Sequence, residues 1–125
     1  MLAARRYKQT AQTTASPERL LVLLLHAAIK NMRLAADGYE GQAGPEADDA
    51  IDKAHEIVLY LQETLDPSAA PELAENLTAT YTFVCLHLTR AMMARDPVKV
   101  REAERVLMPV VEAFDQAVSQ LGKNA

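Results

Sequence analysis

The chain has 125 residues, of which half are hydrophobic, and it carries a net charge of −4. This length fits a single domain that buries roughly two-thirds of the surface exposed by its unfolded chain. The negative charge argues against a nucleic-acid partner, because duplex binding depends on Lys and Arg side chains that neutralise phosphates. The single cysteine excludes an intramolecular disulfide and, with no signal peptide, indicates a cytoplasmic protein.

The first 15 residues are polar and lack a sustained apolar repeat. We therefore predict a mobile N-terminal arm over 1–15, with at most a helical turn, and a folded domain over 16–125. The most apolar stretch runs from Leu20 to Ile29, includes a histidine and is followed by a lysine. It falls short of the ~20 residues that a membrane-spanning helix requires, so we expect no membrane insertion.

A first helix is predicted from Pro17 to about Tyr39. Ser16 is suited to accept a hydrogen bond from a free amide at the helix start, and Pro17 suits the first helical position. Apolar residues then recur at spacings of three and four, which places them in one stripe. This stripe consists of Leu21, Leu25, Ala28, Met32, Ala35 and Tyr39.

A glycine-rich loop over 37–45 separates this helix from a second one, predicted from about Glu46 to Leu65. The second stripe consists of Ala47, Ile51, Ala54, Val58, Leu61 and Leu65. Acidic residues fill its first turns, where they face the positive end of the helix dipole. The acids from Asp37 to Asp66 are predicted to form a solvated face. The alternative is that they attract the basic residues of the arm, Arg5, Arg6 and Lys8, in a contact that salt weakens.

Prolines mark the starts of two further helices, at Pro71 and at Pro97. The third stripe consists of Leu73, Leu77, Tyr81, Val84, Leu88 and Ala91. The fourth consists of Ala103, Leu107, Val110, Phe114, Ala117 and Leu121. Pro109 lies inside the fourth helix and is expected either to kink it or to separate two shorter helices. The sequence therefore predicts an all-α protein: an antiparallel up-and-down four-helix bundle with a short N-terminal arm or extra helical turn.

Three of the predicted helices contain runs of four or more apolar residues. Such runs pass around the helix, because successive residues are about 100° apart. The side chains in excess of the inner stripes include Leu20, Leu23, Ile29, Leu59, Tyr60, Phe83, Leu86 and Met93. The arm, a second copy of the chain or an amphipathic client segment would cover them. The alternative is ordinary packing with a few exposed leucines.

The residue patterns do not favour an enzyme, a cofactor or a metal site. A di-iron bundle needs a Glu-x-x-His pair on two helices, and the nearest pattern is the single pair of Asp52 with His55. The three histidines lie on different predicted helices, and the spacing typical of zinc ligands is missing. Cys85 lies among apolar residues and is predicted to be a small buried side chain rather than a nucleophile.

Several short motifs follow one another along the chain in the same order as in a known protein family. Tyr7 is followed by Thr-Ala-Ser-Pro at 14–17 and by a Leu-rich helix. The pattern Ile-x-Lys-Ala-x-x-Ile-Val-x-x-Leu-x-x-x-Leu-Asp then occupies 51–66, before Ala74, Asn76, Leu77, Tyr81 and the turn at Asp96. From about Tyr7 to Ala117 the chain resembles the flagellin-specific export chaperones called FliS. It differs at 25–27, where Leu-His-Ala replaces the Tyr-Asp-Gly common in that family, and at Phe114, where a Trp is frequent.

The resemblance implies a helical bundle that binds the disordered C-terminal segment of flagellin in the cytoplasm. Binding would prevent premature polymerisation and support delivery to the flagellar export gate. The client-binding residues expected on this basis are Tyr7, as the anchor of an arm that covers the groove, and the excess apolar residues named above. The alternative is a self-associating bundle, a homodimer that buries the same stripes, with a different client.

Overall fold

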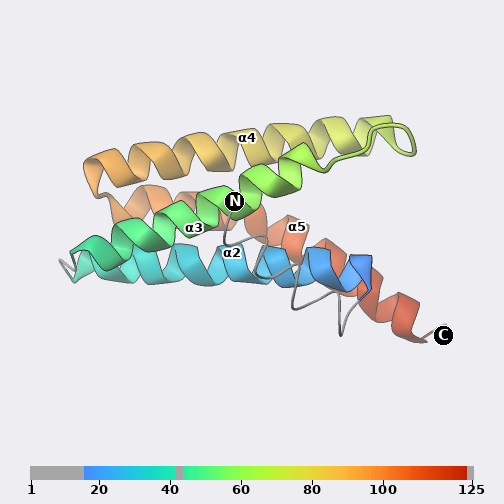
Figure 1. The fold of residues 1–125 in the computed structure, drawn as a ribbon, viewed down its shortest axis with the longest axis horizontal. Helices are drawn as coiled ribbons and strands as arrows, with labels where there is room; N and C mark the ends of the chain where they lie inside the picture. The colour runs from blue at the N-terminus through green and yellow to red at the C-terminus, as the bar shows by residue number, and fades with distance from the viewer. Residues whose placement is uncertain (1–15, 42–43, 124–125) are drawn as a thin grey trace.

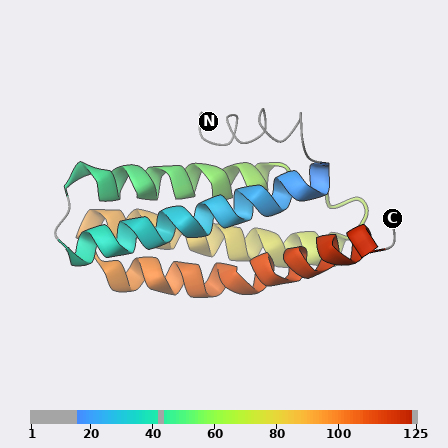
Figure 2. The ribbon, with the colours of Figure 1, turned by 90° about the horizontal axis from the view of Figure 1, so that it is seen from below.

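The computed structural model of the protein describes residues 16–41 and 44–123, which form four helices and no strand (Figure 1). Helix α2 spans Pro17–Glu40, α3 spans Pro45–Glu63, α4 spans Pro71–Ala94 and α5 spans Pro97–Lys123. Each helix packs against the next one in the sequence, and α5 packs back against α2. Neighbouring helices run antiparallel (Figures 1 and 2), so the predicted up-and-down bundle is confirmed. The predicted arm, including Tyr7, lies outside the described residues.

The helix starts follow the local sequence signals. The four described helices begin at Pro17, Pro45, Pro71 and Pro97. A proline costs little there, because the first amide of a helix has no acceptor within the helix. The Ser16 hydroxyl accepts a hydrogen bond from the amide of Arg19 at 3.3 Å, and the Asp96 carboxylate accepts one from the amide of Val98 at 2.9 Å. Both residues therefore supply acceptors to the first turn of their helices, as predicted for Ser16.

The inner stripes of α2, α3, most of α4 and the first half of α5 form the core. The largest of their fully buried side chains include Leu25, Met32, Ile51, Tyr81, Val84 and Leu88. The prediction is wrong for Leu73, which is exposed in the first turn of α4. It is also wrong for the last turns of α5, where Ala117 and Leu121 are exposed. Phe114, one turn earlier, is half-buried and packs against the core.

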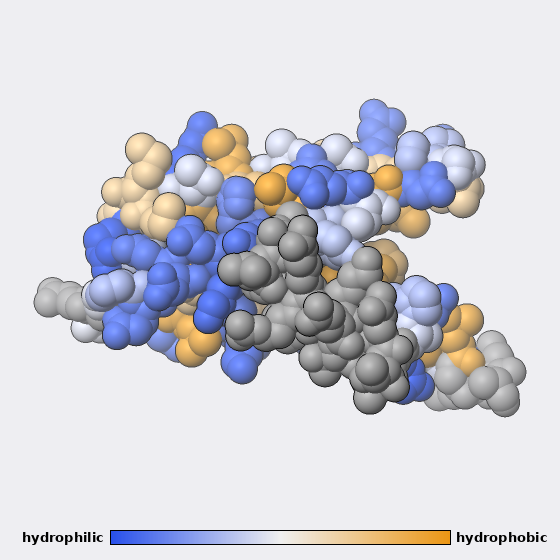
Figure 3. Space-filling model, viewed as in Figure 1, coloured by the Kyte–Doolittle hydropathy of each residue, from blue (hydrophilic) through white to orange (hydrophobic). Residues whose placement is uncertain are grey.

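The exposure of these residues follows from the shape of one end of the bundle. In Figure 1 the last turns of α5 extend past the start of α2 and away from α4. Figure 3 shows a notch in the surface at this end, between the connection from α3 to α4 and the ends of α2 and α5. Residues at this end have fewer neighbouring helices to pack against, so a regular apolar stripe no longer ensures burial.

Pro109 lies within a single helix rather than between two, and Figures 1 and 2 both show α5 curved along its length. Proline has no amide hydrogen, and its ring crowds the carbonyl four residues earlier. These two effects account for a bend in a helix that otherwise continues for 27 residues. Of the two outcomes predicted for Pro109, the structure shows one bent helix.

Alkaline conditions are expected to destabilise the bundle. Burial raises the pKa of Tyr81 to about 12 and that of Cys85 to about 11, both above their ordinary values. A raised pKa means that the unfolded chain loses these protons first, so their contribution to stability is complete below about pH 9 and lost as the pH rises towards 12. Urea denaturation should show the unfolding midpoint falling between about pH 8 and about pH 11, with a smaller fall in Tyr81→Phe. An equal fall in that variant would contradict this assignment.

Candidate functional site

Most of the excess apolar side chains lie on two outer faces of the bundle, and one lies in the core. Ile29 is only 4% exposed, so its predicted place on the surface is wrong. It follows Leu25 by one turn, and the two side chains therefore share the inner side of α2.

Phe83 is exposed on α4, where its ring stacks on His87 with centroids 4.5 Å apart. His87 contacts Glu102 of α5 at 2.7 Å, which places Phe83 towards α5.

The first outer face lies between α3 and α4, and we call it the α3–α4 face. The side-chain amide of Gln62 donates a hydrogen bond to the Thr82 hydroxyl at 2.9 Å, which fixes the register of the two helices. Leu59 lies one turn before Gln62, and Leu86 lies one turn after Thr82, so the two leucines share this face. Met93 lies two turns further along α4. The exposed fractions are 36% for Leu59, 48% for Leu86 and 81% for Met93.

A depression of about 580 Å³ continues the α3–α4 face towards the connection between the two helices. Its lining residues are Gln62, Leu65, Pro67, Pro71, Ala74, Glu75, Thr78 and Ala79. Most of them present methyl or methylene groups, and Gln62 belongs to both the depression and the face. The two features therefore form one apolar surface along the outside of this helix pair.

The second outer face lies between α2 and α3, and we call it the α2–α3 face. Leu20 and Tyr60 are half-buried there against the core, and Leu23 is exposed. Leu34 is exposed by 53% and belongs to the same face, because it follows Leu23 by three helical turns. A depression of about 280 Å³ on this face is lined by Asn31, Leu34, Gly38, Glu46, Ala47, Asp49, Ala50 and Lys53.

Leu34 was not among the predicted surface residues, because Arg33 precedes it and it lies outside the runs of four or more apolar residues. Its spacing of eleven residues from Leu23 was the available signal, since eleven residues complete about three turns of a helix.

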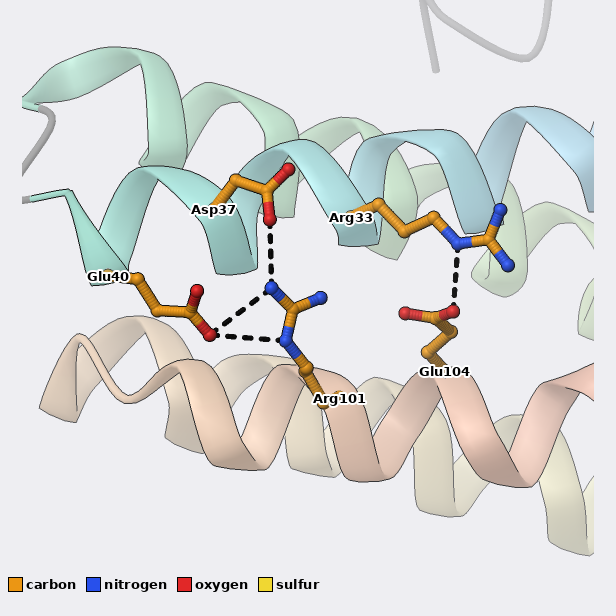
Figure 4. A network of polar contacts seen from close by, with 5 residues as sticks. All are labelled: Arg33, Asp37, Glu40, Arg101 and Glu104. Atoms are coloured by element: carbon orange, nitrogen blue, oxygen red, sulfur yellow. Dashed lines mark hydrogen bonds and ion pairs between the residues drawn. The ribbon is translucent and has the colours of Figure 1, made fainter.

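The face between α2 and α5 has a different character, because matched charges cross it (Figure 4). The Arg33 guanidinium contacts the Glu104 carboxylate at 2.8 Å. Arg101 contacts Asp37 at 2.8 Å and Glu40 at 3.2 Å. We call these contacts, together with the one between His26 and Asp115 at 2.8 Å, the α2–α5 ladder. The ladder occupies this face with polar side chains that already have partners.

A cluster of three side chains joins α2, α3 and α4 at the other end of the bundle from the notch. The Tyr39 hydroxyl donates a hydrogen bond to Asp48 at 2.7 Å, and Arg95 contacts the same carboxylate at 2.9 Å. The Arg95 guanidinium also lies 5.0 Å from the centre of the Tyr39 ring, a cation–π distance. The bond from Tyr39, with the charge of Arg95, lowers the pKa of Asp48. Asp48 is therefore part of an interhelical contact, and not only of the solvated face predicted for this stretch.

Within the described ranges, neither a metal-binding cluster nor a reactive thiol is found. No group of three or more His, Cys, Asp or Glu side chains within 16–41 and 44–121 is placed to hold a metal ion. Cys85 is buried, and burial raises the pKa of its thiol to about 11, so little of the reactive thiolate is present at neutral pH. In the part of the chain that the structure describes, no helix has the length and apolar character to cross a bilayer.

Comparisons with known proteins place this architecture in a family. The family described as "Flagellar protein FliS" matches residues 1–121. A flagellar secretion chaperone FliSB from Pseudomonas aeruginosa is 31% identical over 119 residues, which cover 92% of this chain and 94% of the relative. A flagellar secretion chaperone FliS from Bacillus subtilis is 27% identical over 118 residues, covering 94% of this chain and 87% of the relative.

A solved structure shares the fold. The structure titled "Crystal structure of flagellar chaperone from bacteria" superposes with a TM-score of 0.75 at 18% sequence identity, over 96% of this chain and 98% of that one. At this identity the likeness concerns the arrangement of the helices. The family match over nearly the whole chain and the relative at 31% identity go further. The chain therefore belongs to the FliS family of flagellar proteins.

Proposed function

We propose that this protein is a cytoplasmic chaperone of flagellar secretion that binds the disordered C-terminal segment of flagellin. Its binding prevents premature polymerisation and supports delivery to the flagellar export gate. The observation that carries the proposal is the apolar α3–α4 face, to which α3 contributes Leu59 and α4 contributes Leu86, and which no helix of the described chain covers. Membership of the FliS family supplies the flagellar context.

The geometry suits a client that folds as it binds. An amphipathic helix presents apolar side chains at spacings of three and four, and the grooves between packed helices accept such a stripe. The α3–α4 face and the α2–α3 face provide two such grooves on either side of one helix. A disordered segment long enough to form two helices would occupy both of them. The apolar residues of the client are then buried in the chaperone and are unable to contact other flagellin molecules.

The cost of ordering the client keeps its release feasible. Folding of a disordered segment on binding consumes part of the interaction free energy, on the order of 2–5 kcal/mol. The complex is therefore weaker than its buried apolar area suggests. Such a balance suits a carrier that gives up its client at an export gate.

Calorimetry of the full chain with a peptide of the flagellin C-terminal segment tests this function. We expect binding of one peptide per chain, with a negative heat-capacity change because apolar surface is buried. Circular dichroism of the mixture should show more helix than the sum of the separate components. The proposal is wrong if no heat and no gain of helix appear at micromolar concentrations.

In the homodimer predicted as the alternative, a second copy of the chain covers the same surface. A tight dimer that buries Leu59 and Leu86 would leave the α3–α4 face unavailable to a client. Sedimentation at several concentrations, with and without the peptide, separates the two functions. A monomer that gains only the mass of one peptide supports the chaperone, whereas a dimer that excludes the peptide supports self-association.

A further inference from the structure

Charge is divided unevenly between the two halves of the bundle. Helix α2 holds three acidic and three basic residues, and α5 holds four of each, so both helices are neutral. The segment 45–94, which contains α3 and α4, holds nine acidic and two basic residues, a net charge of −7. In the view of Figure 3, hydrophilic residues dominate the surface over the first turns of α3. The half of the molecule that carries the α3–α4 face is therefore strongly acidic.

The acids that border the α3–α4 face are exposed and have no ion-pair partner within the described residues. Asp52 precedes Leu59 by two turns, and Glu63 follows it by one, so the three share one side of α3. Glu75 lines the depression on α4 and precedes Leu86 by three turns. None of these three acids forms an ion pair with a basic residue of the described chain. By contrast, four acids of the α2–α5 ladder contact an arginine or a histidine.

We propose that the α3–α4 face selects an amphipathic helix whose apolar stripe is flanked by Lys or Arg. The apolar floor of Leu59, Leu86 and the depression takes the stripe, and Asp52, Glu63 and Glu75 pair with the basic flank. This inference rests on the proposed function, in which the helix is part of the flagellin C-terminal segment. It adds the charge pattern by which the chaperone recognises that segment.

The acidic border is expected to affect which client helices bind more than how tightly they bind. Each exposed ion pair contributes little to affinity, because water and salt screen it. Several charges of one sign beside a groove nevertheless accelerate the approach of a basic segment and oppose an acidic one. A helix with acidic flanks would place like charges beside Asp52 and Glu63, which disfavours it although its apolar stripe fits. The α2–α5 ladder offers no comparable site, because its carboxylates already have partners.

The test compares charge variants of the full chain in calorimetry and stopped-flow measurements with the flagellin C-terminal peptide. The triple variant Asp52→Lys, Glu63→Lys and Glu75→Lys is expected to bind about tenfold more weakly at about 50 mM NaCl, mostly through slower association. The difference should shrink at about 500 mM NaCl. Replacing the Lys and Arg residues of the peptide by Gln should produce a similar loss with the unchanged chain.

The matched control is Glu112→Lys, which reverses an exposed acid on α5 away from the α3–α4 face. We expect it to change the affinity less than about twofold. Thermal unfolding by circular dichroism establishes that the variants fold. If the triple variant is unstable, Glu63→Lys alone and the peptide substitutions carry the test.

The outcomes separate this inference from the proposed function. Equal affinity and equal association rates for the triple variant and for Glu112→Lys would overturn the inference alone, because the peptide would still bind. Absence of binding to the unchanged chain would overturn the proposed function. It would also overturn the inference that a flagellin helix occupies the α3–α4 face. Tighter binding of a peptide with acidic flanks would reverse the inferred charge pattern.

Discussion

Replacing Leu59 and Leu86 together by glutamate is expected to weaken binding of the flagellin peptide at least about a hundredfold. The two side chains are exposed on the α3–α4 face, which we propose as the binding surface, and apolar anchors near the centre of an interface usually carry most of its binding free energy. Two carboxylates at this position would be desolvated by the client without a partner for their charge. Calorimetry at equal protein concentrations measures the change.

The stability of the bundle should change little in this double variant, because both leucines are more than one-third exposed. The control is the double variant Val98→Glu and Val106→Glu, which places two carboxylates at exposed apolar positions of α5. We expect the control to bind the peptide within about threefold of the unchanged chain. Equal losses in the two double variants would mean that the α3–α4 face is not the binding surface.

Replacing Leu107 by alanine is expected to lower the free energy of unfolding by about 2–5 kcal/mol. Leu107 is fully buried on α5, and the removed atoms would leave a cavity that the surrounding helices fill only in part. Urea denaturation measures the change as a lower midpoint with an unchanged slope.

The same substitution at Leu73 is the matched control, because Leu73 is 54% exposed in the first turn of α4. We expect a change of less than about 0.5 kcal/mol there. A large loss at Leu73 would mean that the end of α4 packs more closely than the structure shows. A small loss at Leu107 would contradict its place in the core.

The inner stripes of the helices could be predicted from sequence because burial follows the period of the helix. The stripe of α3 holds from Ala47 to Leu61, where two neighbouring helices flank it along its length. The same rule fails at Leu121, since periodicity identifies the side that a residue faces but not how far the neighbouring helices extend. Helix α5 continues where its neighbours diverge, and its apolar stripe becomes exposed.

The candidate site could be predicted only in part. Runs of apolar residues correctly indicated exposed side chains at Leu59, Leu86 and Met93. They also included Ile29, because a run that passes around a helix does not show which member turns inward. The contacts of the α2–α5 ladder were not visible in the sequence, since each charge pair joins residues far apart along the chain. His26 and Asp115 are separated by 89 positions, and no local pattern relates them.

The α2–α5 ladder bears on how the chain folds while it is being synthesised. It joins the first described helix to the last, so the ring of four helices closes only after α5 has left the ribosome. The α3–α4 hairpin joins helices that are neighbours in sequence, so it can form before α5 is available. Contacts between nearby segments also form fastest. A nascent chain would thus expose the inner sides of three helices until the 27 residues of α5 emerge. Truncations within α5 should therefore yield aggregating chains rather than smaller folded proteins.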